Sequence, residues 1–486
     1  RAWALKKASK LGEKNSANLR SKPDDAMAWG QRAVIIVAIL AISEALKTSL
    51  SPHPTPLVVA LQRPAHRHGI QATKTSAATS TGLGTLCSTR QMKALTRSPS
   101  QEGLSVVRLK DLSRTEYVGI LGVGTNCSAG ACVPAAELDV VFDTGSSDIW
   151  VASDLCTQGA CTMEGRHRFN RSTSSTFRAD ANPQAFQTAY ATGTLSGMLG
   201  ADDVWVGGTM RARGQKLGLI AEEYGSAFYS MPIDGIVGLG FSGLSDTKAL
   251  MDTLVEEKVL QQIEFAFFFF RDVNKGGALI WGNAQQLQLH QGPLMWFPVV
   301  QEKFWSLPLR GFRLGRNSTV DLLHLLWPYE KKPDDGPFLR ELTEVSDAPL
   351  SKKAHLIMDS GTTFFTAPQR LFNEITKVIE PAMCHYVHVF PELVFTVGTS
   401  LTNHSAVEEL IIPPEVYMVR DGDDRCEPGF MNLAGLPEDP PMMILGEVFM
   451  RHYISIYRRG QIKGDSWVAL APTKADAEAD SLLQKR

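Results

Sequence analysis

Two short motifs carry the residues best suited to chemistry. Asp143-Thr144-Gly145-Ser146-Ser147 stands in the first half of the chain, and Asp359-Ser360-Gly361-Thr362-Thr363 repeats its pattern in the second half. Each motif follows an apolar run, so each predicts a buried strand that ends on a carboxylate in a tight, glycine-containing turn. Two carboxylates about 3 Å apart cannot both ionise, so they share one proton and can serve as general acid and general base. The repeat predicts a paired-aspartate active site; two ordinary strand-to-turn junctions are the plain alternative.

The residues around the two aspartates are of types that position a carboxylate. Glycines let the backbone approach it closely, and hydroxyls can donate to its oxygens or link the two turns. Turn capping explains each hydroxyl equally well when it is taken alone. The supporting residues that we predict are Thr144, Gly145, Ser146, Ser360, Gly361 and Thr362.

A third segment predicts a β-hairpin. Tyr190-Ala191-Thr192-Gly193-Thr194 lies between strand-like runs and combines a glycine with an aromatic residue at its base. Such a hairpin suits a flap over a cleft, and a plain β-turn with a core tyrosine is an equally good interpretation.

The composition predicts a mostly-β globular protein of more than one domain. The chain has 486 residues, which is too long for one ordinary core. Its formal net charge is −2, which argues against nucleic acid as a main partner. The chain holds 40 glycines, its helical periodicity is sparse, and runs such as Val204-Trp205-Val206 are typical of strands.

The cysteines predict disulfides and therefore an oxidising compartment. Zinc is the alternative for closely spaced pairs, but no histidine pair has the matching spacing, so we predict no metal. The seven cysteines form two close pairs, one distant candidate pair and one remainder: Cys127 and Cys132, Cys156 and Cys161, Cys384 and Cys426, and Cys87.

The N-terminal segments have the composition of a leader and a prosegment. Residues 1–42 combine a basic stretch with an apolar run of ten residues from Ala33 to Ile42, shorter than the roughly 20 that span a membrane. This pattern predicts a secretory signal or a signal anchor, through which the protein could associate with a membrane; a short buried helix is the alternative. Residues 43–104 are rich in proline and small polar residues and predict a prosegment or flexible linker.

The remaining chain divides between the two aspartate motifs. We predict an N-terminal lobe over 105–298, with the first aspartate and the flap, and a C-terminal lobe over 299–472. The polar, proline-containing segment 316–353 predicts a surface insertion in the second lobe, and 473–486 predicts a polar, frayed tail. One carboxylate from each lobe would place the active site at their junction.

These motifs resemble those of pepsin-like aspartic endopeptidases of the bilobal eukaryotic type, over roughly Leu109 to Pro472. The leader is similar to that of the plasmepsin branch. The resemblance implies an all-β, bilobal fold of two β-barrels with the active-site cleft between the lobes. It rests on Glu116–Gly124, Asp143–Trp150, Ile233–Gly240, Phe304-Trp305 and Ile444–Phe449.

The resemblance also implies residue roles. Asp143 and Asp359 would be the catalytic pair, and Tyr190 and Gly193 would belong to the flap. Cysteines 156 with 161, and 384 with 426, fall where family disulfides fall. An apolar pocket would prefer a bulky side chain, Phe or Leu, before the cut, although each of its residues also suits a plain core position. The implied pocket residues are Val141, Trp150, Phe228, Ile233 and Ile236.

The function that follows is hydrolysis of peptide bonds at acidic pH, with proteins and peptides as substrates and no cofactor. We expect a monomer in the secretory pathway: secreted, in an acidic vesicle or vacuole, or held at a membrane by an uncleaved leader. One alternative is a catalytically silent pepsin-like binding protein. Another takes the two motifs as phosphate loops of an actin- or hexokinase-like ATPase, but the β-rich pattern, the paired cysteines and the leader oppose it.

Overall fold

The structure is a computed structural model that describes residues 104–484, except 113–115, 129, 181–183, 191–192, 261–262, 323–353, 422–423 and 433–441. The described chain is mostly β-structure, as the sequence predicts. The predicted leader, Cys87, nearly all of the predicted prosegment and most of the predicted insertion lie outside these residues. Among the described helices, none has the length and apolar character needed to cross a membrane.

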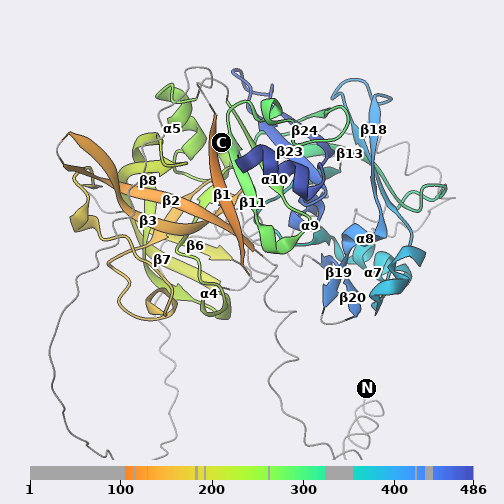
Figure 1. The fold of residues 1–486 in the computed structure, drawn as a ribbon, viewed down its shortest axis with the longest axis horizontal. Coiled ribbons are helices and arrows are strands. Elements are labelled where there is room, and N and C mark those ends of the chain that lie inside the picture. Colours follow the sequence, from red (N-terminus) through yellow and green to blue (C-terminus); the bar gives the residue numbers. More distant parts are fainter. Residues whose placement is uncertain are drawn as a thin grey trace, which may run out of the picture.

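Six strands close into a mixed barrel in the left half of Figure 1. The last strand of the ring, β7, pairs back with the first, β2. Two further strands, β5 (Arg178–Ala179) and β6 (Ala185–Tyr190), pair with β7 outside the ring. The ring follows the order β2 (Glu116–Ser128), β3 (Ala131–Asp143), β9 (Gly235–Gly238), β4 (Ile149–Ala152), β8 (Met210–Tyr224) and β7 (Gly193–Val206). The short helices α4 (Ser226–Ser230) and α5 (Leu250–Glu256) follow β8 and β9.

A central sheet continues from the barrel through β1 and contains strands from both predicted lobes (Figure 1). Two of its strands come from the C-terminal end of the chain, and β23 pairs with β10 from the predicted N-terminal lobe. The predicted lobe boundary near residue 298 stays a prediction. The sheet order is β12 (Met295–Pro298), β24 (Trp467–Pro472), β23 (Tyr453–Arg458), β10 (Glu264–Phe269), β11 (Gly277–Trp281) and β1 (Ser105–Leu112).

The second half of the chain builds its own sheets, at the right of Figure 1. The larger sheet runs β18 (Val407–Ile412), β17 (Leu393–Gly398), β13 (Ser306–Leu314), β14 (His355–Met358), β22 (Met442–Leu445), β15 (Phe365–Ala367) and β21 (Phe430–Asn432). The smaller sheet runs β16 (Ala382–Met383), β20 (Arg425–Pro428) and β19 (Met418–Asp421). The helices here are α7 (Gln369–Val378), α8 (Pro414–Tyr417) and α9 (Glu447–Met450).

The strands that precede the two aspartates share one arrangement. In the first half β3 pairs in parallel with β9, and in the second half β14 pairs in parallel with β22. Parallel strands are usually covered on both faces, so their sequences are continuous runs of apolar residues. The run Val140–Phe142 and the run Leu356–Met358 are both buried throughout. Continuous burial therefore explains why the sequence before each motif lacks polar alternation.

The C-terminal tail differs from the predicted frayed segment. Residues Asp476–Gln484 form α10, and Ala479 and Leu483 pack into the apolar cluster on one face of the central sheet. The Asp476 carboxylate accepts hydrogen bonds from the backbone N–H groups of Arg271 and Asp272, at 3.0 and 2.8 Å. The helix is mostly polar because only a narrow stripe of it meets the core.

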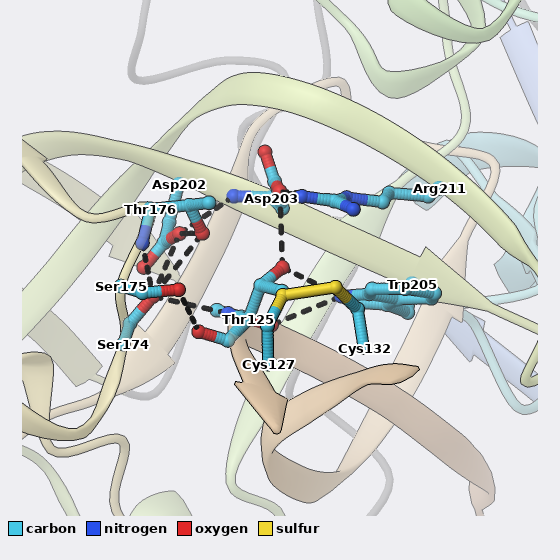
Figure 2. Close-up of a disulfide and its surroundings, with 11 residues drawn as sticks. Thr125, Cys127, Cys132, Ser174, Ser175, Thr176, Asp202, Asp203, Trp205 and Arg211 are labelled. Atoms are coloured by element: carbon cyan, nitrogen blue, oxygen red, sulfur yellow. Dashed lines mark hydrogen bonds and ion pairs between the residues drawn. A yellow bond between two sulfur atoms is a disulfide. The ribbon is translucent and has the colours of Figure 1, made fainter. Parts of the chain in front are cut away.

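The structure contains the three disulfides that the sequence predicts: Cys127–Cys132, Cys156–Cys161 and Cys384–Cys426. The first joins direct cross-strand partners near the tip of the β2–β3 hairpin. Figure 2 shows it beside Thr125 and Trp205, whose indole N–H donates to Thr125 Oγ1 at 3.2 Å. The first two bridges close loops of five residues, whereas the third joins segments 42 residues apart.

Trp305 connects the two halves of the molecule behind the first aspartate. Its side chain is 1% exposed, and its indole N–H donates to the Leu239 carbonyl at 2.9 Å. The backbone N–H of Leu239 in turn donates to the Asp143 carbonyl at 2.7 Å. The Trp305 ring also packs against Phe241 and Tyr457.

We therefore expect Trp305→Phe to lower the free energy of unfolding by about 1–3 kcal/mol, because the buried Leu239 carbonyl loses its donor. Urea unfolding followed by intrinsic fluorescence measures the change. Trp467→Phe is the control, since the indole N–H of Trp467 donates to an exposed carboxylate, that of Asp465. Equal unfolding curves for the Trp305 variant and the wild type would contradict this role.

Candidate active site

The structure places each motif aspartate at the end of its buried strand. Asp143 is the last residue of β3 and pairs with Gly238 of β9. Asp359 follows β14 directly, and its backbone N–H donates to the Leu445 carbonyl at 3.1 Å. Both residues are almost fully buried, with 0% and 2% of their surface exposed. The two halves thus present equivalent carboxylates from equivalent strand ends.

The two turns are linked by an exchange of hydrogen bonds across the molecule. The Thr144 N–H donates to Ser360 Oγ at 3.0 Å, and the Ser360 N–H donates to Thr144 Oγ1 at 2.9 Å. Each hydroxyl then donates onward to a strand carbonyl of the opposite half, Met358 at 2.9 Å and Phe142 at 2.7 Å. The predicted link between the turns is present, and it fixes one aspartate relative to the other.

Each carboxylate is held by the two donors of its own motif. The Gly145 N–H donates to Asp143 at 2.8 Å, and the Ser146 hydroxyl donates to the other oxygen of the same group. Asp359 has the same arrangement, with donors at 2.9 and 2.7 Å. Those donors are the Gly361 N–H and the Thr362 hydroxyl, so all six predicted supporting residues surround the pair.

The two carboxyl groups meet. A Cβ added at Gly145 would lie 2.7 Å from both Asp359 oxygens, so only a glycine fits between that carboxylate and the first turn. The charge of Asp359 acts directly on Asp143, as expected of neighbouring carboxyl groups. Two carboxylates this close to each other cannot easily be ionised at the same time.

Burial and mutual repulsion shift the acidity of this pair. Burial, followed by the charge of Asp359, raises the pKa of Asp143 well above its ordinary value. Burial also raises the pKa of Asp359, although the hydrogen bond from Thr362 and the neighbouring Asp143 oppose the shift. The pair thus retains a proton at a pH where separate aspartates would be ionised.

The predicted flap is the hairpin formed by β6 and β7. Tyr190 and Gly193 are paired in register at its end, and residues 191–192 between them lie outside the described chain. A Cβ at Gly193 would lie 2.3 Å from the Tyr224 carbonyl and 2.6 Å from the Phe228 ring. The end of the hairpin next to its turn therefore rests directly on the segment that carries Phe228.

The five predicted pocket residues come together in one apolar cluster. Trp150 and Phe228 meet edge to face, with ring centroids 6.3 Å apart. Each of the five is at most 2% exposed. The cluster also contains Phe186, Leu195 and Met231, so it extends from β4 and β9 toward the flap. Its predicted members are Val141, Trp150, Phe228, Ile233 and Ile236.

A buried ion network next to this cluster was missed from the sequence. Arg166, Glu223 and Asp234 have side chains that are 0–1% exposed, and Arg166 lies 2.7 Å from Glu223 Oε1 and 3.6 Å from Asp234 Oδ1. One signal could have revealed it: Asp234 stands inside an apolar strand signature, Ile233-Asp234-Gly235. A carboxylate in such a run needs a buried partner.

Glu116 is another buried carboxyl that sequence reasoning missed, and the charges of the aspartate pair act on it. Burial, then the charges of Asp143 and Asp359, raise its pKa well above the ordinary value. Glu116 is 3% exposed and lies at the start of β2. Because it is disfavoured as an anion, it adds little negative charge near the pair.

One group of possible metal ligands occurs among the described residues, formed by Asp139, His167 and Asp234. The Asp234 carboxylate already accepts hydrogen bonds from the backbone N–H groups of Asp139 and His167, at 2.9 and 2.6 Å. The guanidinium of Arg166 lies beside it. A second cation would be repelled there, so the donor set is a poor fit for a metal.

The family model for eukaryotic aspartyl proteases matches residues 116–324 and 340–467. These ranges contain both aspartate motifs and most of the described chain. The chain belongs to the eukaryotic aspartyl protease family. As a member of this pepsin-like family, the protein is a hydrolase of peptide bonds.

Individual relatives agree. The chain is 28% identical to Aspartic protease 3 of Toxoplasma gondii over 385 residues, which cover 76% of this chain and 52% of the relative. It is 27% identical to pepsin A of Bos taurus over 375 residues, 75% of this chain and 86% of the relative. It is 28% identical to cathepsin E-B of Xenopus laevis over 372 residues, which cover 74% of this chain and 79% of the relative. The chain thus spans about half the length of the Toxoplasma protein and most of the others.

Proposed function

We propose that Asp143 and Asp359 are the catalytic pair of this aspartic protease. The observation that carries the proposal is the closeness of two buried carboxyl groups at the first turn, each held by a glycine N–H and a hydroxyl. The exchange between Thr144 and Ser360 keeps the two groups in register. Such preorganisation lets an acid and a base act without rearrangement.

The pair hydrolyses a peptide bond through a bound water. The ionised carboxylate takes a proton from the water as its oxygen forms a bond to the scissile carbonyl carbon. The protonated carboxyl gives its proton to the carbonyl oxygen, which produces a neutral tetrahedral diol. In the second step the C–N bond breaks, and the leaving nitrogen takes the proton held by the first carboxyl. The second carboxylate recovers a proton from a diol hydroxyl, which restores the starting state.

The raised pKa values of the pair predict how activity depends on pH. Turnover needs one proton on the pair, so kcat/KM falls as rising pH removes it and falls again when strong acid adds a second. We expect a bell-shaped profile with its maximum at acidic pH, measured on one peptide between about pH 2 and about pH 8. A rate that stays constant through neutrality would contradict the shared proton. The raised pKa values also make folding stability depend on pH. The pair stabilises the folded state most at low pH, where it is protonated, and this stabilisation is lost as pH rises.

The apolar cluster supports a preference for Phe or Leu before the cut. Val141, Trp150, Phe228, Ile233 and Ile236 are the wall that we propose for this side chain, with Tyr190 and Gly193 in the flap above it. A bulky apolar residue gains most from such a wall because its transfer from water is the most favourable. The flap lifts to admit the peptide and closes on it.

We propose that the protein works in the secretory pathway, because its three disulfides need an oxidising compartment. A secreted form, an acidic vesicle or vacuole and a membrane-anchored form all meet this condition, and acidic compartments suit the pair best. We further expect a monomer with protein and peptide substrates, no cofactor and no nucleic-acid partner. The predicted leader would supply any membrane association.

Digestion of acid-denatured globin tests the proposal. We expect cleavage near pH 4, a typical carboxyl pKa, and its loss with a statine-type inhibitor, whose hydroxyl stands where the diol would form. Binding of denatured globin without cleavage would identify a catalytically silent binding protein instead. Cleavage that the inhibitor leaves untouched would point to a different set of catalytic groups.

A further inference from the structure

Arg166 lies at the centre of the buried ion network beside the apolar cluster. It follows the Cys156–Cys161 disulfide, whose cysteines are fully buried. Its side chain is 1% exposed. An arginine buried this deeply must be paired, because an isolated charge in the interior is strongly disfavoured.

The guanidinium bridges three segments that are distant along the chain. Its two terminal nitrogens donate to the two oxygens of Glu223, at 2.7 and 3.2 Å. One of them also donates to the Phe228 carbonyl at 3.4 Å. Its Nε lies 3.6 Å from Asp234 Oδ1, an ion pair too long for a hydrogen bond. A planar guanidinium is suited to such a fork, whereas a lysine ammonium can serve only part of it.

These contacts converge on the segments that form the apolar wall. Phe228 belongs to α4, a five-residue helix. A helix this short does not hold itself together, so its position depends on outside contacts. Asp234 lies between two wall segments, since Ile233 precedes it and Ile236 follows two residues later. The turn end of the flap hairpin also rests on Phe228, through Gly193.

We propose that Arg166 is a positioning residue that sets the preference for bulky side chains, because its ion pairs with Glu223 and Asp234 hold Phe228 and the Ile233–Ile236 segment in place. The inference rests on the proposed peptidase function and deepens it. Arg166 itself does not touch the aspartate pair in this arrangement; it acts through the wall. A shift of the wall by a fraction of an ångström then changes how well a large side chain fits.

The test uses three peptides that differ only in the residue before the cut: Phe, Leu or Ala. For Arg166→Lys we expect the ratio of kcat/KM between the Phe and Ala peptides to fall about tenfold. The fall should come from a higher KM for the Phe peptide, with its kcat nearly unchanged. The kcat/KM for the Ala peptide should also stay nearly unchanged. A role in folding alone would lower the thermal midpoint and leave this ratio as it is, and that result would overturn the inference.

A second variant covers the case in which lysine fails to fold. Arg166→Met combined with Glu223→Gln removes both charges of the closest pair, so no uncompensated Glu223 anion stays buried. Burial raises the pKa of Glu223 although Arg166 opposes the shift, so we expect a neutral glutamine to be accepted at this position. The kcat/KM ratio between the Phe and Ala peptides should fall in the double variant as in Arg166→Lys. An unchanged ratio in a folded double variant would overturn the inference.

Arg211 supplies the matched control in the same half of the molecule. It pairs with Asp203 at the polar network near the Cys127–Cys132 disulfide, and its guanidinium lies 4.9 Å from the Trp205 ring (Figure 2). Neither Arg211 nor Asp203 belongs to the apolar cluster. Arg211→Lys should therefore leave the Phe-to-Ala ratio unchanged, and a tenfold fall there would overturn the assignment to Arg166.

Failure of the proposed function is distinguishable from failure of this inference. If the wild type cleaves none of the three peptides, or cleaves Phe and Ala peptides equally, the proposed function or its preference is wrong. If the wild type prefers Phe and both folded Arg166 variants keep that preference in full, only the positioning role is wrong.

Discussion

Asp143→Asn and Asp359→Asn should each reduce kcat by about a thousandfold or more, because a neutral amide can act neither as the base nor as the acid of the pair. The two variants should be equally inactive, since the acid and base roles belong to the pair rather than to one residue. Digestion of a fluorogenic peptide at the acidic optimum measures the loss.

The fold should survive these substitutions. Both side chains are buried, and burial disfavours their anionic forms, so an amide of the same shape costs little stability. Thermal unfolding should therefore stay close to that of the wild type at acidic pH. Asp465→Asn, at an exposed position, is the control for the amide substitution itself. Near-normal turnover in either pair variant would show that the two carboxyl groups do not perform the reaction.

Gly145→Ala should reduce kcat by roughly a hundredfold, through geometry rather than through loss of a functional group. The new methyl would lie 2.7 Å from both Asp359 oxygens and 2.8 Å from its Cγ, a separation that real Cβ atoms do not adopt. The Asp359 carboxyl or the first turn must therefore move, and the two groups no longer share their proton in the same geometry. We expect a stability loss of about 1–3 kcal/mol as well, typical of an overpacked site.

Gly243→Ala is the matched control for this effect. The nearest atom to a Cβ at Gly243 is the Glu302 carbonyl oxygen at 3.6 Å, which is ordinary contact. Its kcat should equal that of the wild type. Full activity of Gly145→Ala would mean that catalysis tolerates displacement of Asp359. That result would contradict the proposal that catalysis depends on the close contact of the two carboxyl groups.

The parts of the site that sequence reasoning predicted are those with a local signature. Each aspartate follows an apolar strand and precedes a glycine, and this order alone predicts a carboxylate at a strand end. The hairpin between Tyr190 and Gly193 was also predictable, because a glycine between two strand-like runs marks a turn. The close cysteine pairs belong to the same class, since a bridge across a short loop follows from spacing.

Long-range contacts were beyond such reasoning. The central sheet pairs β23 with β10. The sequence of neither strand identifies its partner, because the same pattern of apolar residues allows pairing with many strands. The predicted frayed tail is a helix for a similar reason: only Ala479 and Leu483 are fully buried in it, too few to stand out in a polar segment.

The sequence by itself determined the chemistry of this protein: two carboxylates at strand ends, the glycines and hydroxyls around them, and a β-rich chain to carry them. Only the tertiary structure decided how those groups meet. The contact of Gly145 with Asp359, the exchange between Thr144 and Ser360, and the pairing of Arg166 with Glu223 all join residues far apart in the chain. Local periodicity reports which face of a segment is buried, whereas the partner of a buried charge is set by packing among distant segments.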